Sequence, residues 1–311
     1  MQISIGKQQD GRSVLEILKK DLALSSRLIT FLKSNETGIL LNGVRVTVRA
    51  KVKYGDILSI DYKDSPEICN SSVVPTELPI DVIYEDDDII AVNKPADMPT
   101  HPSLNHYADT LANALTYYFR SSESPFVFRA ISRLDNGTSG IVLVAKNRLS
   151  ALRLSRSMAC GKIKKEYFAV LDGRITPAEG IINRAIKRKG ESLIERVCCD
   201  EADEGARSAI TEYRTVVSNN LFSAVLARPV TGRTHQLRVH FSSMGAGICG
   251  DTLYGYPSEF ISHQALHAYS LSFPHPTTNE QMLLTAPIPD DIKQLCENAF
   301  GVRDIKLNQE R

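Results

Sequence analysis

Near the N-terminus, apolar residues recur first at helical spacing and then in short runs bounded by turn residues. The stretches 14–18 and 28–32 each place apolar side chains on one face of a helix. Residues 38–46 then run Gly-Ile-Leu-Leu-Asn-Gly-Val-Arg-Val, and Asn-Gly between two apolar runs is the strongest short-range signal for a β-hairpin. A strand-like alternation follows at 58–62. We therefore predict a small α/β domain over residues 1–62.

A segment with little periodicity separates this domain from the rest of the chain. Residues 63–79 contain three prolines and the run Asn-Ser-Ser, which is typical of a linker. Beyond it, the pattern predicts strands at 81–85, 89–93, 141–145, 167–171, 213–217 and 222–226, and helices that begin after Asp109, Asn147 and Thr234. The last helix would bury Leu237, Phe241 and Met244, although the same stretch also alternates like a strand. Because strands and helices alternate irregularly, we expect an α+β domain with a mixed, mostly antiparallel sheet over residues 80–311.

The composition is that of an ordinary globular protein, with 42% hydrophobic and 23% charged residues in a chain of 311. No apolar run approaches the roughly 18–20 residues that cross a bilayer, and the first residues show no signal peptide. The six cysteines form no C-x-x-C pair. We therefore expect reduced thiols, a cytoplasmic location, no membrane partner and a monomer.

Charge is distributed unevenly along the chain, although the formal net charge is only +1. Residues 1–62 carry ten Lys and Arg against six Asp and Glu, and residues 133–165 carry eight against one. Residues 64–88 carry eight acids and no base. The total excludes a uniformly basic protein. The segments predict two basic surfaces, with the acidic segment turned away from both.

Residues 131–146 hold the strongest candidate for chemistry. Asp135 lies between Arg133-Leu134 and the turn Asn136-Gly137, and an apolar strand follows. Such a turn permits an unusual backbone and presents a short acidic side chain at the end of a sheet. Taken alone, an Asp in this position more often bonds nearby amides than carries out catalysis.

Two histidines are the only candidates for a metal site. His235 and His240 lie five residues apart, whereas zinc pairs on one helix face usually lie four apart, and no nearby Cys or Glu completes the set. The sequence also lacks a glycine-rich nucleotide-binding motif. We therefore predict neither a metal nor a cofactor.

Several segments together resemble the RluA-type pseudouridine synthases. The segment R-L-D-x-x-T-S-G around Asp135 is similar to the catalytic motif of that family, and the other similar segments occur in the expected order. They are Val92-Asn93-Lys94-Pro95 with His101-Pro102, Lys164-Lys165-Glu166-Tyr167, Pro229–His240, Gly250–Gly255, Leu266-His267-Ala268 and Phe273–Pro276. An ordered set of this size, over about residues 80–290, is difficult to obtain by chance. The chain departs from the family where Ser132 replaces the usual His and Asp97 the common Gly.

The resemblance implies roles for individual residues. Asp135 would be the catalytic carboxylate, acting either as a nucleophile on the sugar or in an elimination through a glycal, and Arg238 would pair with it. Tyr167 would stack near the uracil, with its hydroxyl as a candidate proton acceptor. The expected substrate-binding residues are Arg133, Leu266, Arg233 and Thr138. Arg233 also adjoins a predicted helix N-terminus, which suits phosphate.

The order of elements in residues 1–62 resembles an S4-type RNA-binding domain. With the larger domain, it implies an RNA pseudouridine synthase, an isomerase without a cofactor, acting on ribosomal RNA of the large subunit in preference to tRNA. Two alternatives remain at this point. One is a non-catalytic RNA-binding or ribosome-assembly protein on the same fold, which only Ser132 favours. The other is a metal hydrolase using His235 and His240, which lacks a third ligand.

Overall fold

A computed structural model describes residues 1–64, 73–122 and 125–307. The N-terminal part is a small antiparallel sheet, ordered β1-β4-β2-β3, under short helices. Its elements are β1 (Gln2–Ser4), η1 (Lys7–Gln9), α1 (Val14–Glu16), a π turn labelled η2 (Ile17–Asp21), α2 (Ser26–Ser34), β2 (Ile39–Leu41), β3 (Val44–Arg45) and β4 (Ile57–Ile60). The predicted hairpin is confirmed, since Leu41 pairs with Val44 across Asn42 and Gly43. Both turn residues have positive φ, 52° and 81°, as a tight hairpin turn requires.

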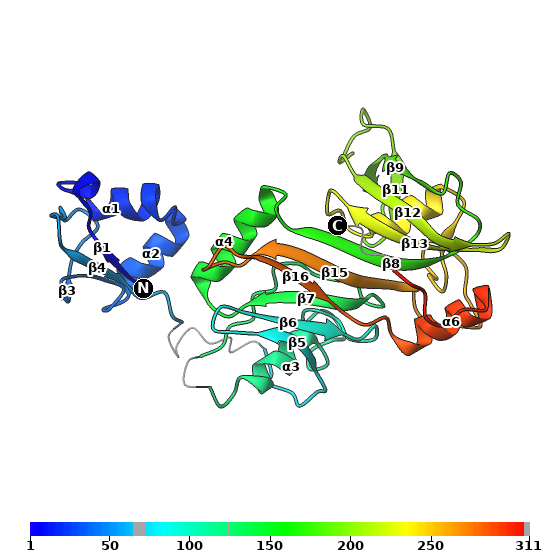
Figure 1. Cartoon of the computed structure of the whole chain (residues 1–311), viewed down its shortest axis with the longest axis horizontal. Helices are drawn as coiled ribbons and strands as arrows, with labels where there is room; N and C mark the ends of the chain where they lie inside the picture. The colour runs from blue at the N-terminus through cyan, green and yellow to red at the C-terminus, as the bar shows by residue number, and fades with distance from the viewer. Residues whose placement is uncertain (65–72, 123–124, 308–311) are drawn as a thin grey trace.

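The larger part is built on one sheet of ten strands (Figure 1), ordered β5-β6-β7-β15-β8-β13-β12-β9, with β14 beside β8 and β16 beside β15. The strands are β5 (Asp81–Glu85), β6 (Ile89–Lys94), β7 (Ser139–Ala145), β8 (Lys164–Asp172), β9 (Glu179–Asn183), β12 (Ile210–Ser218), β13 (Phe222–Pro229), β14 (Gly247–Ile248), β15 (Leu266–Pro274) and β16 (Gln281–Thr285). Among these described strands, only β7 and β15 run parallel. The expected α+β fold with a mixed, mostly antiparallel sheet is confirmed.

Among its described residues, the larger part has four helices: α3 (Leu111–Tyr118), α4 (Arg148–Ala159), α5 (Gln236–Ser243) and α6 (Asp290–Phe300). Successive residues of β6 and β7 alternate between two cores. Val92 and Val142 pack in the core that includes Leu115 of α3, whereas Ala91 packs in the core that includes Leu154 of α4. The sheet is therefore covered on both faces at this point. None of the described helices is long and apolar enough to cross a membrane.

The helix starts correct two details of the prediction. Asn147 caps α4 as expected, but α3 is capped by Thr110 and not by Asp109. The stretch that also fitted a strand is the helix α5, and its N-cap is His235, which has a left-handed φ of 56°, and not Thr234. Met244, expected on the buried face of that helix, is 38% exposed.

The two parts of the chain contact each other at α4, the helix of the larger part that lies nearest the N-terminal part in Figure 1. Leu149 of α4 is buried in the core of the N-terminal part, and Arg148 stacks on Phe31 with 4.0 Å from its Cζ atom to the ring centroid. Asp64 is nearly buried and lies 2.7 Å from Arg129 and 2.8 Å from Arg148. Residues 65–72 of the expected linker lie outside the described residues.

The prediction that the acidic segment turns away from the basic segment is wrong. Glu85 lies 2.8 Å from Lys146, and Asp64 is ion-paired with Arg148. Both cations belong to the basic segment 133–165. Close ion pairs of opposite charge are favourable, so acids of residues 64–88 neutralise part of that segment.

A separate two-stranded sheet was not predicted from the sequence. It consists of β10 (Ala185–Arg188) and β11 (Arg196–Cys199), antiparallel, with Ala185 opposite Cys199. Its two strands carry three basic residues, Lys187, Arg188 and Arg196.

Candidate active site

Asp135 lies in a loop that enters β7, and several hydrogen bonds hold that loop in place. The Thr100 hydroxyl bridges the backbone of Leu134, at 3.1 Å from its oxygen and 3.4 Å from its nitrogen. The Gly137 N–H donates to the Ala96 carbonyl at 2.7 Å. Gln264, from the segment before β15, donates to the Asn136 carbonyl at 2.8 Å. The backbone on both sides of Asp135 is therefore fixed before any substrate binds.

The loop requires glycine at position 137. Its φ is +85°, and a Cβ atom there would lie 2.4 Å from Oε1 of Gln264. Glycine reaches this backbone region without strain. The Asn-Gly turn therefore lets Gln264 approach closely enough to hold the loop.

The Asp135 carboxylate is accessible and faces two nitrogen-bearing side chains of α5. Its side chain is 21% exposed, with Oδ2 3.7 Å from Nη1 of Arg238 and 3.8 Å from Nε2 of His235. Both distances are longer than a hydrogen bond. The carboxylate thus has two nitrogen-bearing groups nearby while its oxygens remain available to another group.

Arg238 has a closer partner than Asp135. It forms a bidentate pair with Asp251, with Nε–Oδ2 at 2.7 Å and Nη2–Oδ1 at 2.8 Å. Burial alone would lower the pKa of Arg238, but the hydrogen bonds and charge of Asp251 outweigh burial and raise it. For Asp251, burial opposes ionisation, yet Arg238 and the amides of Leu253 and Tyr254 lower its pKa. The sequence predicted a pair between Arg238 and Asp135 and missed Asp251.

His235 is held by Tyr254. The Tyr254 hydroxyl accepts from the Arg196 N–H and lies 2.8 Å from Nδ1 of His235. Because that hydroxyl can donate its own proton to Nδ1, we assign the ring proton of His235 to Nε2, which faces Asp135. Burial lowers the pKa of His235 and the charges of Arg238 and Arg196 reinforce this, while Asp135 opposes it. The ring is therefore neutral at pH 7.

Tyr167 and Leu266 lie on the same face of neighbouring strands. Tyr167 of β8 pairs with Ala268 of β15, and Leu266 pairs with Ala169, so the four side chains share one face. A β-bulge follows in β15 directly after Ala268. Burial raises the pKa of Tyr167, and the nearby charge of Asp135 adds to this shift. Its phenol is protonated at neutral pH and lies within electrostatic reach of Asp135.

Lys94 is a buried cation that the sequence analysis did not assign to the site. It is 1% exposed and donates from Nζ to the carbonyls of Pro95, at 2.6 Å, and Met98, at 2.7 Å. Burial lowers its pKa to about 8, although the charges of Asp97 and Asp135 oppose the shift. Lys94 therefore adds a titratable positive charge near Asp135.

The expected substrate-binding residues fall in different surroundings. Arg133 is exposed beside the Asp135 loop. Thr138 is 2% exposed, and its hydroxyl accepts from Gln264 at 3.1 Å, within the loop's support. Arg233 precedes α5 and donates from Nε to the Ser208 carbonyl at 2.9 Å. Their contacts with substrate remain predictions.

The geometry does not favour the metal alternative. His240 is fully buried, with Nδ1 2.9 Å from the Thr211 hydroxyl and Nε2 3.0 Å from the Arg184 carbonyl. Both ring nitrogens are therefore occupied within the fold, and His235 faces Asp135 instead. No group of three potential ligands lies together in the described part of the chain.

Three residues of the site that the sequence did not predict lie inside its recognisable motifs. Asp251, Tyr254 and His235 all lie inside the quoted motifs Gly250–Gly255 and Pro229–His240. A polar residue inside a motif of the family is therefore a candidate partner of the catalytic acid, even where the spacing alone does not show the contact. Chemically, the arrangement offers an accessible carboxylate, a fixed guanidinium, a neutral imidazole and a phenol above an apolar face.

Comparison with known proteins agrees with this site. A family model described as RNA pseudouridylate synthase matches residues 88–243. The chain is 35% identical over 277 residues to the uncharacterized RNA pseudouridine synthase YjbO of Bacillus subtilis, covering 89% of this chain and 96% of the relative. It is also 35% identical over 282 residues to the ribosomal large subunit pseudouridine synthase D of Blochmanniella floridana, covering 84% and 86%.

A solved structure extends the comparison to the fold. The human RNA pseudouridylate synthase domain containing 1 matches with a TM-score of 0.56 and 30% identity, over 68% of this chain and 84% of that chain. Residues 88–243, which the family model matches, include Asp135, Tyr167 and Arg238. The chain therefore belongs to the RNA pseudouridine synthase family and is an isomerase of that class.

Proposed function

We propose that this enzyme isomerises uridines in large-subunit ribosomal RNA, with Asp135 as the reacting carboxylate. The observation that carries the proposal is the position of Asp135, accessible at the end of a fixed loop and 3.7 Å from an arginine that Asp251 already neutralises. An ionised carboxylate that is not engaged in a strong hydrogen bond is suited to attack a sugar carbon or to stabilise positive charge on it.

The reaction breaks the N1–C1′ bond of uridine and forms a C5–C1′ bond. A proton then leaves C5, and N1 ends the reaction protonated. Asp135 acts on the sugar in this scheme, as a nucleophile or in the elimination route. Tyr167 and Leu266 form a face against which the detached uracil rotates. Because a neutral phenol accepts a proton only while giving up its own, the Tyr167 hydroxyl takes the C5 proton after C5 has bonded to C1′ and passes its own proton on toward N1, which ends the reaction protonated.

The target uridine has to leave the RNA stack before Asp135 can reach its sugar carbon. Base pairing and stacking hide C1′ and the base edges, so enzymes that act on a base extrude it. Exposed Arg133 beside the Asp135 loop is suited to contact the RNA there.

Two observations support ribosomal RNA as the substrate. The relative from Blochmanniella floridana is named a ribosomal large subunit pseudouridine synthase. The N-terminal part has two short helices and a small sheet, in the order that resembles an S4-type domain. We infer that this part, residues 1–62, is an RNA-binding domain and that residues 80–311 are the catalytic domain.

The test uses large-subunit ribosomal RNA and tRNA, each labelled with tritium at C5 of uridine. The wild-type enzyme should release tritium from ribosomal RNA, and Asp135→Asn should abolish the release. Asp87→Asn is the matched control, because it removes an exposed carboxylate in the turn between β5 and β6. Release from tRNA alone would overturn the ribosomal assignment. Absence of release from both RNAs, with binding retained, would favour the non-catalytic alternative.

A further inference from the structure

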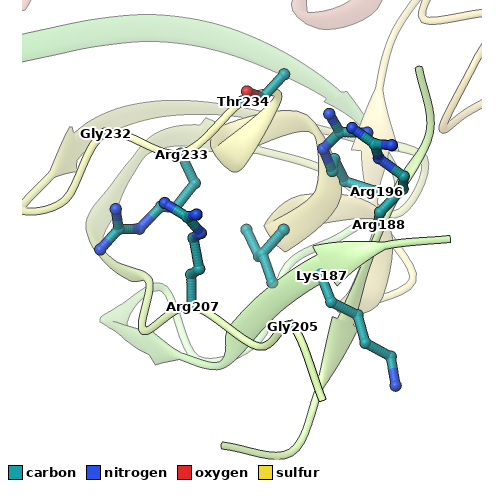
Figure 2. Close-up of a pocket in the computed structure, with 9 residues that line it drawn as sticks. Lys187, Arg188, Arg196, Gly205, Arg207, Gly232, Arg233 and Thr234 are labelled. Atoms are coloured by element: carbon teal, nitrogen blue, oxygen red, sulfur yellow. The ribbon is translucent and has the colours of Figure 1, made fainter. Parts of the chain in front are cut away.

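A cavity lined by five basic side chains lies beside α5 (Figure 2). Lys187 and Arg188 come from β10, Arg196 from β11, and Arg207 and Arg233 from neighbouring loops. The volume is about 370 Å³. In Figure 2, Arg207 and Arg233 flank one side of the cavity, and Arg188 and Arg196 the other. The four arginines therefore line one space from separate segments, whereas Lys187 extends away from them in Figure 2.

Most of these charges are not neutralised by the protein. Lys187 lies 2.6 Å from Asp203. The four arginines have no carboxylate within ion-pair distance among the residues that the structure describes. Arg196 and Arg233 are instead oriented by backbone carbonyls, at 2.9 Å from those of Glu195 and Ser208. Like charges held together raise the free energy unless an anion binds between them.

The cavity is connected to the catalytic carboxylate through a short chain of contacts. The backbone of Arg196 donates to the Tyr254 hydroxyl, Tyr254 contacts His235, and His235 lies 3.8 Å from Asp135. Thr234, which lines the cavity, directly precedes His235. The cavity lining and the Asp135 carboxylate are therefore linked through Tyr254 and His235 within one part of the fold.

The chemistry of the lining favours phosphate over a base. Guanidinium groups match the oxygens of phosphate in bidentate geometry. The lining holds no aromatic side chain on which a base would stack, and Ile186 is its one large apolar residue. We propose that this cavity binds a backbone phosphodiester of the RNA flanking the target uridine. The proposal rests on the proposed function, and it assigns to the β10–β11 hairpin the positioning of RNA without reading of its sequence.

The test compares two double variants that each lose two positive charges. Arg188→Gln with Arg207→Gln removes two exposed arginines of the cavity. Arg303→Gln with Lys306→Gln is the control, because both residues are exposed near α6, outside the cavity lining. Tritium release gives kcat and KM for each enzyme. RNA affinity is measured at several salt concentrations on the same variants in an Asp135→Asn background, which cannot turn over.

The cavity variant should raise KM about tenfold with kcat within about twofold of wild type, because two charge-assisted contacts are lost. The slope of log affinity against log salt should decrease by about 0.7, the value for losing one phosphate contact of single-stranded RNA. Equal affinities and slopes for the cavity variant and the control would overturn the proposal. If RNA binding depends on the cavity but wild type releases no tritium, the proposed function fails and the cavity assignment stands. If wild type releases tritium normally but the cavity variant behaves like the control, the proposed function stands and the cavity assignment fails.

Discussion

Replacing Asp251 by Asn tests whether this buried acid, and not Asp135, holds Arg238. The Asp251 side chain is fully buried and accepts four hydrogen bonds, two from Arg238 and one each from the amides of Leu253 and Tyr254. Removing one partner of a buried ion pair leaves the other charge uncompensated and destabilises a fold by about 3–5 kcal/mol. Because Asn retains one acceptor oxygen, we expect the lower end of that range, about 3 kcal/mol. A chain of 311 residues has an unfolding entropy of about 0.65 kcal/mol/K, so that loss lowers Tm by about 5 °C.

The same change should reduce the catalytic rate. Once Asp251 is neutral, Asp135 is the carboxylate nearest to Arg238, at 3.7 Å from Nη1. The freed guanidinium would turn toward Asp135 and engage the oxygens that must reach the sugar. Tritium release, measured well below the Tm of the variant, should therefore show a lower kcat.

The stability difference between wild type and Asp251→Asn should depend on pH in a defined direction. Arg238 and the two amides lower the pKa of Asp251 in the folded state, against the effect of burial. A depressed carboxyl pKa stabilises the fold above the unfolded value of about 3.9, and the stability is lost as the pH falls through the folded value. The Tm difference between wild type and Asp251→Asn should thus be full at neutral pH and shrink in acid. A Tm within about 2 °C of wild type at pH 7 would refute the reasoning.

Three further changes probe the loop, the buried cation and the contact between the two parts of the chain. Gly137→Ala should lower both stability and kcat, because a Cβ atom would lie 2.4 Å from Oε1 of Gln264 at a φ of +85°; thermal melting and tritium release measure the two effects. Lys94, whose pKa burial lowers to about 8, should lose its charge above that pH, so the wild-type rate should fall there and the Lys94→Gln rate should be lower but flat across the same range. Asp64→Asn should lower the free energy of unfolding in urea by about 1–3 kcal/mol, because it leaves two partly buried arginines without their shared carboxylate.

Each of these expectations has an opposing result. A Gly137→Ala enzyme with wild-type kcat would show that the loop tolerates displacement from Gln264. If the Lys94→Gln rate fell at alkaline pH as the wild-type rate does, a group other than Lys94 would be responsible for that fall. An Asp64→Asn protein that unfolds at the wild-type urea concentration would show that the apolar contact at Leu149 suffices to hold the two parts together.

The sequence predicted elements whose signal is local. The Asn42-Gly43 hairpin needs only a turn with positive φ, and α4 begins where Asn147 accepts from Ser150. The strand β15 was missed because its apolar alternation is interrupted. Leu266 and Ala268 are followed, after the bulge, by apolar positions 271 and 273, so no single period of two spans the strand. Its partner β7 also lies far away in the sequence, which no local pattern indicates.

The sequence predicted some members of the candidate site and the approach of Arg238 to Asp135, at 3.7 Å, but not Lys94 or the closer partner Asp251. Asp135 and Arg238 were identified from their motifs, but the sequence cannot tell which of two acids lies closer to an arginine. Asp251 is 13 residues from Arg238, beyond the end of α5, and only the turn after that helix brings it within 2.7 Å. A motif can identify the residues of an ion pair from the sequence, whereas the distance between their charged groups depends on the tertiary structure.

The distribution of ion pairs explains how a chain of net charge +1 can recognise an anion. Several acids form ion pairs with cations that support the fold. Asp251 neutralises Arg238, and Glu85 neutralises Lys146. Asp64 holds the contact with α4. The arginines around the β10–β11 cavity receive no such partner in the described chain. Attraction between exposed charges decays over about 8 Å at physiological ionic strength, so the local surplus around the cavity determines RNA affinity there, and the total charge of the protein does not.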